Sequence, residues 1–371
     1  MARTASRVSR RVFLGSALAA IKLAAQGKKG LAFAPEWLSY EDPTTELEVV
    51  RLTDPAHSSE LPAYYNRAVA HNSASLLYGA DRTGPPQAFH LDLRTGESRQ
   101  LTEVAELDVA SLALSADSRS FCCFAGRSLL HVSLGTLRQR EIYQLPEAWQ
   151  RCPGMSLTPD GAHVLFAEQR GETSRLRAVS LARGISRTVI EARFAIEHPQ
   201  ARPGRDQILY RQAGDALWLV DSGGANNRRL KLAPGRIGST LWSPNGKAIQ
   251  YLNFPDDPTQ LHAIRELSPD TGADRLVAKT SQFACFGANR DSSVFVGASA
   301  NRSSPTVLLL LRITRREFTL CEHKATRPET VAPLFSPDSR RVLFQSDRDG
   351  RPAIYSTHVD KLVEPTESDS G

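Results

Sequence analysis

The hydrophobic positions of this chain fall in short, strand-length runs, and many of these runs follow a turn. The clearest copies pair a turn at residues 158–161, 243–246 or 336–339 with an apolar run that starts three residues later. Weaker copies lie at residues 72–73, 116–118, 203–205 and 289–291. One residue from each turn, taken in chain order, gives steps of 41 to 48 residues. A repeat of about 40–45 residues with short strands is typical of the blades of a β-propeller.

The last repeat illustrates how one unit is built. Pro337 fixes a backbone torsion and Asp338 can bond the backbone that follows, so this segment predicts a turn. The β-favouring residues 341–345 predict a strand, and residues 353–356 predict a second strand that returns. One such sheet leaves both faces exposed, whereas seven sheets packed in a ring cover one another. We therefore predict an all-β, seven-bladed β-propeller.

The propeller is predicted to span residues 35–362 as one domain. Residues 47–53 precede the first repeat and read as a strand, which we expect to complete the last blade and close the ring. Residues 363–371 are acidic and rich in Ser and Thr, and they predict a loose tail. In this architecture the functional residues are expected in the central channel and at its rim.

Residues 1–34 predict an export signal. Arg10 and Arg11 lie in a run that matches the twin-arginine pattern, and a modestly apolar stretch follows over residues 12–25. This stretch is too short and too polar to span a bilayer, and no later segment suits a membrane. We expect export to the periplasm or the cell exterior, with residues 32–34 as a candidate cleavage site.

The net charge of the chain is concentrated in this leader. The chain has 46 Lys and Arg, 40 Asp and Glu, and a formal net charge of +6. Residues 1–34 hold seven of the basic residues and none of the acidic ones, so the rest of the chain is close to neutral. A nucleic-acid-binding protein needs a basic face, and none is indicated. Nucleic acid is therefore not an expected partner.

Several short sequence segments resemble those of the oligogalacturonate lyases, a polysaccharide lyase family built on a seven-bladed propeller. The resemblance runs from about residue 40 to residue 359, and it includes Tyr64-Tyr65-Asn66-Arg67, His198-Pro199-Gln200, Leu217-Trp218-Leu219-Val220, Trp242-Ser243-Pro244-Asn245-Gly246 and Val342-Leu343-Phe344-Gln345-Ser346. It implies β-elimination of short pectic oligogalacturonides. In that reaction a base removes the proton beside the uronate carboxylate, while a bound metal ion spreads the developing charge.

The resemblance also implies a set of site residues, and this chain departs from that set. In the family, three His and one Gln hold the metal, and a further His and an Arg act at the reacting centre. The metal His positions fall on Cys285, Thr330 and Ala332, and the Gln position falls on Arg327. The base His falls on Ser239 and the Arg falls on Ala216. We therefore expect no catalytic residue of the family type and no cofactor, with manganese as the ion if a family-like site is retained.

Three other features are candidates for substrate binding. His198 heads an expected strand and could face the channel, and Arg67 could hold a uronate carboxylate. Arg327 would repel a metal ion but could itself bind a carboxylate. For each residue, a purely structural or solvated side chain is the alternative. The residues thus leave three functions open: a relative that acts as a lyase, a non-catalytic binder of acidic oligosaccharides, and a TolB-type periplasmic propeller that contacts other proteins.

Overall fold

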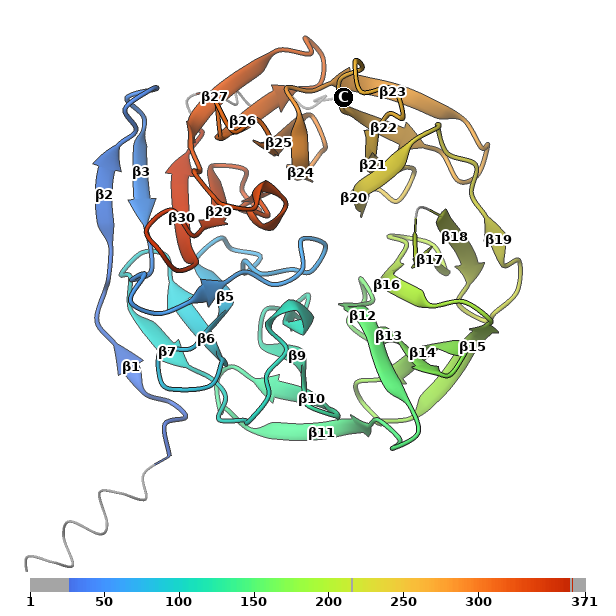
Figure 1. The fold of residues 1–371 in the computed structure, drawn as a ribbon. Coiled ribbons are helices and arrows are strands. Elements are labelled where there is room, and N and C mark those ends of the chain that lie inside the picture. The colour runs from blue at the N-terminus through green and yellow to red at the C-terminus, as the bar shows by residue number, and fades with distance from the viewer. Residues whose placement is uncertain (1–26, 215, 361, 363–371) are drawn as a thin grey trace, which may run out of the picture.

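The computed structural model describes residues 27–214, 216–360 and 362. Seven antiparallel sheets are arranged radially around a central axis (Figure 1). The predicted all-β, seven-bladed propeller is confirmed. The expected leader falls outside the described residues up to residue 26, and the expected tail at residues 363–371 falls outside them entirely.

In blades 1 to 4 the strands run outward in chain order from the hub, and in blade 1 the N-terminal strand β1 is added outside the last of them. Blade 1 contains β4 (Ser59–Glu60), β5 (Ser75–Ala80), β6 (Gln87–Asp92) and β7 (Ser98–Gln100), with β1 (Ala32–Phe33) at its outer edge. Blade 2 contains β8 (Ala113–Leu114), β9 (Ser120–Ala125), β10 (Ser128–Ser133) and β11 (Gln139–Gln144). Blade 3 contains β12 (Gln150–Leu157), β13 (His163–Arg170), β14 (Thr173–Ser180) and β15 (Ser186–Ala192). Blade 4 contains β16 (Ile196–Ala201), β17 (Gln207–Gln212), β18 (Ala216–Asp221) and β19 (Arg228–Arg229).

Blades 5 to 7 complete the ring. Blade 5 contains β20 (Arg236–Trp242), β21 (Ile249–Phe254), β22 (Ala263–Leu267) and β23 (Asp274–Lys279). Blade 6 contains β24 (Phe283–Ala288), β25 (Val294–Ser299), β26 (Thr306–Leu311) and β27 (Glu317–Glu322). Blade 7 contains β28 (Leu334–Phe335), β29 (Arg341–Ser346), β30 (Ala353–His358), β3 (Glu48–Arg51) and β2 (Leu38–Glu41). Within the described part of the chain the helical segments are two 3₁₀ turns, η1 (Val109–Ser111) and η2 (Pro328–Thr330), and no helix there is long and apolar enough to cross a membrane.

The ring is closed by strands from both ends of the chain. The N-terminal strand β3 pairs with the C-terminal strand β30, with Val49 opposite Thr357 and Arg51 opposite Tyr355. The Thr357 hydroxyl also donates to the backbone oxygen of Glu48 at 2.9 Å. The strand expected over residues 47–53 therefore lies where the sequence predicted it, in the last blade.

The turn between the first and second strands of each blade has a recurring backbone geometry. In every blade one turn residue has a left-handed conformation, with φ between 55° and 68°, and these residues are Ser73, Ser118, Gly161, Gly204, Gly246, Ser292 and Ser339. In six blades the preceding Asn or Asp accepts a hydrogen bond from the backbone N–H two residues further on, as Asp160 does from Ala162 at 3.0 Å. Such side-chain bonds stabilise the turn without any tertiary contact, which explains why the repeat is visible in the sequence.

The hydrophobic core lies between neighbouring blades. Phe124 of blade 2 and Phe166 of blade 3 are fully buried and meet edge to face with ring centroids 5.1 Å apart. Burying a side chain of this size contributes about 1.5–3 kcal/mol. Since each sheet buries residues on both of its faces, the stability of one blade depends on its two neighbours.

The direction of the innermost strands gives the hub two distinct ends. Strands β12, β16, β20 and β24 begin at one end, which we call the entry end. They finish at the turns described above, at what we call the turn end. Cys285 lies in the first half of β24, Ser239 lies at the middle of β20, and the assigned positions Arg327, Thr330 and Ala332 precede β28.

Candidate functional site at the hub

Two consecutive tyrosines cross the hub from blade 1. The segment that precedes β5 extends into the middle of the ring (Figure 1) and carries Tyr64 and Tyr65. The Tyr64 hydroxyl accepts a hydrogen bond from the backbone N–H of Thr240 in blade 5 at 3.0 Å. The Tyr65 hydroxyl lies 3.0 Å from Nδ1 of His198 in blade 4. Burial raises the pKa of both phenols, so both hydroxyls keep their protons at neutral pH.

His198 lies at a bulge in β16, where pairing with β17 shifts register between Glu197 and Gln200. Its φ of 48° is unusual for a residue with a side chain and turns the imidazole toward Tyr65. Burial, together with the positive charge of Arg211, lowers the pKa of His198 to about 4. The imidazole is therefore neutral at pH 7 and can act as an acceptor or a neutral donor.

Arg211 anchors the same region from the end of β17. Its guanidinium donates to the backbone oxygens of Gly214 at 2.9 Å and Ile237 at 2.8 Å, and so ties blade 4 to blade 5. Arg211, His198, Tyr64 and Thr240 surround a space of only about 10 Å³, so these side chains pack closely. Sequence reasoning did not identify Arg211 or the two tyrosines as hub groups, although the resemblance included the phrase with Tyr64 and Tyr65.

The four positions that the resemblance assigns to a metal hold a thiol, a guanidinium, a hydroxyl and a methyl group. Cys285 is buried, burial raises the pKa of its thiol to about 12, and its Sγ donates to the backbone oxygen of Pro328 at 3.4 Å. Arg327 is 70 % exposed and donates to Glu329 at 3.1 Å. Thr330 donates to the backbone oxygen of Arg327 at 2.8 Å, and Ala332 offers no ligand atom. Manganese prefers oxygen and imidazole ligands, so a protonated thiol and a guanidinium do not fit it.

The described residues contain no group of three or more His, Cys, Asp or Glu side chains placed to hold a metal ion. The positions assigned to the base and the catalytic Arg are occupied by Ser239 and Ala216. Ser239 is 8 % exposed and Ala216 is 7 % exposed, and neither carries a group that titrates near neutral pH.

The structure does not bring the three candidate binding residues into one site. His198 lies toward the entry end beside Tyr65, and Arg327 precedes η2 on an exposed loop. Arg67 lies instead at the turn end, where it lines two cavities of about 400 and 220 Å³. Tyr65 lies between the two regions: its hydroxyl bonds His198, and its side chain also lines the cavities beside Arg67.

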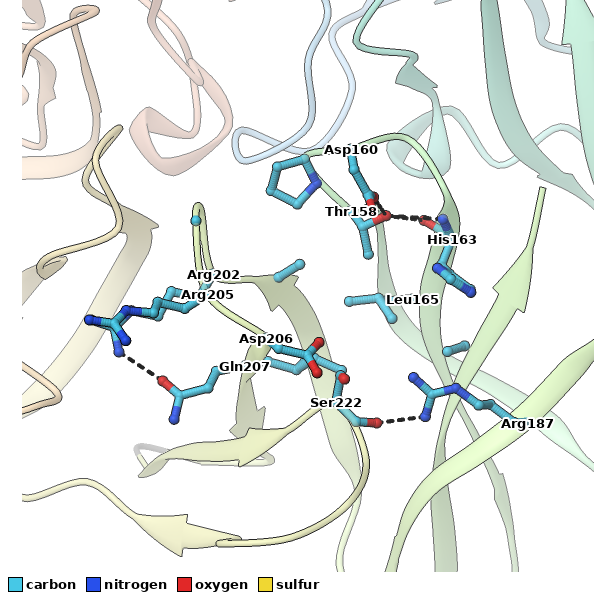
Figure 2. A pocket seen from close by; sticks show the side chains of 15 residues that line it. Thr158, Asp160, His163, Leu165, Arg187, Arg202, Arg205, Asp206, Gln207 and Ser222 are labelled. Carbon is cyan, nitrogen blue, oxygen red and sulfur yellow. Dashed lines mark hydrogen bonds between the residues drawn. The ribbon is translucent and has the colours of Figure 1, made fainter. Parts of the chain in front are cut away.

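A further cavity of about 410 Å³ lies between blades 3 and 4 (Figure 2). Its polar side chains bond mainly to neighbouring protein groups. Arg187 donates to the backbone oxygen of Ser222 at 2.5 Å, and Arg202 donates to Gln207 at 2.7 Å (Figure 2). With acidic and basic groups both present and several of them already bonded, this cavity does not indicate one class of ligand.

A family model described as oligogalacturonate lyase matches residues 24–170. An oligogalacturonate lyase of Dickeya dadantii is 27 % identical over 392 residues, which cover 91 % of this chain and 99 % of that protein. An oligogalacturonide lyase of Pectobacterium atrosepticum is 27 % identical over 378 residues, which cover 88 % and 96 %. A Tol-Pal system protein TolB of Nitratidesulfovibrio vulgaris is 28 % identical over 134 residues, only 29 % of its length.

Two solved structures share the fold over nearly their whole length. An oligogalacturonate lyase in complex with manganese has a TM-score of 0.85 and 24 % identity, with 90 % of this chain and 98 % of that chain covered. An oligogalacturonate lyase from Vibrio parahaemolyticus also has a TM-score of 0.85 and 24 % identity, with 91 % and 100 % covered. The blade number, the matching segments along the chain and the full-length similarity agree: this chain is a seven-bladed propeller that is similar to the oligogalacturonate lyases.

Proposed function

We propose that this chain binds short acidic oligosaccharides of the pectic type and does not carry out metal-dependent β-elimination. The observation that carries this proposal is the set of side chains at the four assigned metal positions, Cys285, Arg327, Thr330 and Ala332. The proton beside a uronate carboxylate is weakly acidic, and its removal needs a nearby positive centre that stabilises the developing charge. A buried protonated thiol and an exposed ion pair do not supply that centre. Full-length similarity to lyases supports an acidic sugar as the ligand.

The first test is an assay for elimination. The chain is incubated with oligogalacturonides with and without manganese, and the ultraviolet absorbance of the unsaturated product is followed. We expect no rise above the control without protein, while the lyase of Dickeya dadantii, run in parallel, gives a rise. A manganese-dependent rise produced by this chain would overturn the non-catalytic assignment.

A thermal unfolding experiment tests binding independently of turnover. A ligand present at one hundred times its dissociation constant stabilises the folded state by roughly 2.7 kcal/mol. Digalacturonate is therefore expected to raise the unfolding temperature in a concentration-dependent manner, and neutral digalactose serves as the control. No shift at millimolar digalacturonate would favour the alternative of a protein-binding, TolB-type propeller.

We also propose that the chain is exported through the twin-arginine route. The run around Arg10 and Arg11 supports this proposal. The double substitution Arg10→Lys and Arg11→Lys is expected to leave the full-length protein in the cytoplasmic fraction, whereas Arg7→Lys should be exported like the unaltered chain. Equal export of the double variant would contradict the proposal.

The strand β1 bears on where the leader is cut. Phe33 pairs with Ser98 of β7, its ring lies 5.9 Å from that of Phe89, and the guanidinium of Arg82 lies 3.9 Å above it. A cut after Ala34 would remove this strand from blade 1. We therefore propose a cut before Ala32, and the intact mass of the exported protein measures its position.

A further inference from the structure

Arg67 is a cation without an acidic partner among the described residues. Its guanidinium donates to the backbone oxygens of Ala116 at 2.9 Å and Ser115 at 3.5 Å, both in the neighbouring blade 2. These bonds hold the side chain at the turn end of the hub and leave its charge uncompensated. Partial burial accordingly lowers the pKa of Arg67, and no carboxylate acts against that shift.

The two cavities beside Arg67 contain no competing charge. They share Tyr65, Asn66, Arg67, Leu241, Trp242 and Pro244, and neither is lined by any Asp, Glu, Lys or His. Their rims include proline rings from the turns of four blades, namely Pro159, Pro203, Pro244 and Pro337. The larger cavity, at about 400 Å³, falls within the range of small-ligand pockets. The cavities thus combine one guanidinium with the uncharged rings of proline, tyrosine and tryptophan. This combination suits a ligand in which one carboxylate is attached to a ring with an apolar face.

We propose that the turn end of the hub is a carboxylate-binding site centred on Arg67, and that it takes a terminal uronate residue of an acidic oligosaccharide. This inference rests on the proposed function and places its ligand at the end of the hub opposite the assigned metal positions. The planar guanidinium can hold a carboxylate through two parallel hydrogen bonds. The half-buried Trp242 lines both cavities, its Nε1 donates to the backbone oxygen of Gln200 at 3.3 Å, and the Arg202 guanidinium lies 5.4 Å from the centre of its ring, so its indole can contact the sugar ring only on the side away from Arg202.

The tyrosine pair separates this site from the entry end. Tyr65 lines the cavities around Arg67, while its hydroxyl bonds His198 on the other side. The space around His198 and Arg211 is about 10 Å³, too small for a sugar residue. In this arrangement the oligosaccharide binds at the turn end, and Arg327 at the other end of the hub does not contact it.

Calorimetric titration with digalacturonate tests the site. Arg67→Gln removes the charge and is expected to weaken binding by about 10- to 100-fold, because hydrogen bonds to charged groups contribute about 1.5–3 kcal/mol. Arg67→Lys keeps the positive charge but cannot form two parallel hydrogen bonds to a carboxylate, so it should give an intermediate loss of affinity. Arg327→Gln, the matched control at the other end, should bind within about twofold of the unaltered chain. The methyl ester of digalacturonate should bind the unaltered chain and Arg67→Gln equally weakly.

The outcomes separate this inference from the proposed function. If the unaltered chain binds digalacturonate and a folded Arg67→Gln variant binds it equally well, the Arg67 site is wrong and the proposed function stands. If the unaltered chain does not bind digalacturonate, the proposed function fails and this inference fails with it. Binding of a peptide with a free C-terminal carboxylate that depends on Arg67, without any binding of the sugar, would overturn the assignment of ligand class. Circular dichroism and unfolding temperature confirm that each variant is folded.

Discussion

Replacing Glu266 with alanine is expected to lower the free energy of unfolding by about 3–5 kcal/mol. The Glu266 side chain is 3 % exposed and accepts hydrogen bonds from Arg312, Arg275 and Gln250 at 2.6 to 3.1 Å. Glu266 belongs to blade 5, whereas Arg312 follows the third strand of blade 6. Removing the carboxylate leaves the Arg312 charge without its partner at the contact between two blades, which explains the large expected loss.

The pH dependence of this contact follows from the same bonds. Burial alone would raise the pKa of Glu266, but the hydrogen bonds from Arg312, Gln250 and Arg275 outweigh it and the pKa is lowered. A carboxyl group whose pKa is lower in the folded state stabilises the fold above its unfolded pKa. That stabilisation is lost as the pH falls through the folded pKa.

Glu329→Ala is the matched control for Glu266→Ala. Glu329 is 57 % exposed and pairs with the 70 % exposed Arg327, so its removal should change the free energy of unfolding by less than about 1 kcal/mol. Urea unfolding followed by tryptophan fluorescence measures both variants. Equal losses of unfolding free energy for the two variants would show that the buried contacts of Glu266 do not stabilise the fold more than an exposed ion pair does.

Replacing Gly154 with alanine is expected to cost about 2–5 kcal/mol of unfolding free energy. Gly154 has φ of +92°, which is costly for a residue with a side chain. A Cβ atom there would lie 2.6 Å from Cα of His198 and 2.7 Å from the Tyr65 hydroxyl oxygen. Since one of these neighbours is backbone, the clash cannot be relieved by turning a side chain. The substitution should therefore also disturb the contact between Tyr65 and His198.

Gly171→Ala isolates the contribution of the backbone torsion. Gly171 lies in the turn between β13 and β14 with φ of +56°, and a Cβ atom there would meet no atom within 4 Å. This variant should lose only about 1–2 kcal/mol. The same urea experiment compares the two alanine variants, and a loss for Gly154→Ala no larger than that for Gly171→Ala would contradict close packing of the hub.

The fold could be predicted from the sequence because its signals are local. The Asn or Asp and the left-handed Ser or Gly that follows it make their bonds within one turn, as Asp160 and Gly161 do. The closing strand over residues 47–53 was found in the same way, from its β-favouring residues. The pairing of Ala32 and Phe33 with β7 was not foreseen, because a two-residue strand has no periodicity and depends on its partner.

The candidate site was harder to predict because its contacts join distant parts of the chain. Tyr65 and His198 are 133 residues apart, and Tyr64 and Thr240 are 176 residues apart. No pattern in a single sequence indicates such pairs. The resemblance identified which positions to inspect, but it did not show that Arg67 and His198 lie on opposite sides of the tyrosine pair.

The closure of the ring has a consequence for the synthesis of the protein. Blade 7 joins Glu48 to Thr357, residues separated by 309 positions, and closing so long a segment carries a substantial entropic cost before the contacts form. In a nascent chain whose β30 has not yet left the ribosome, β3 lacks the strand that joins it to the rest of blade 7. Prematurely terminated copies therefore keep open sheet edges, and these edges mark them for proteolysis or for binding by chaperones.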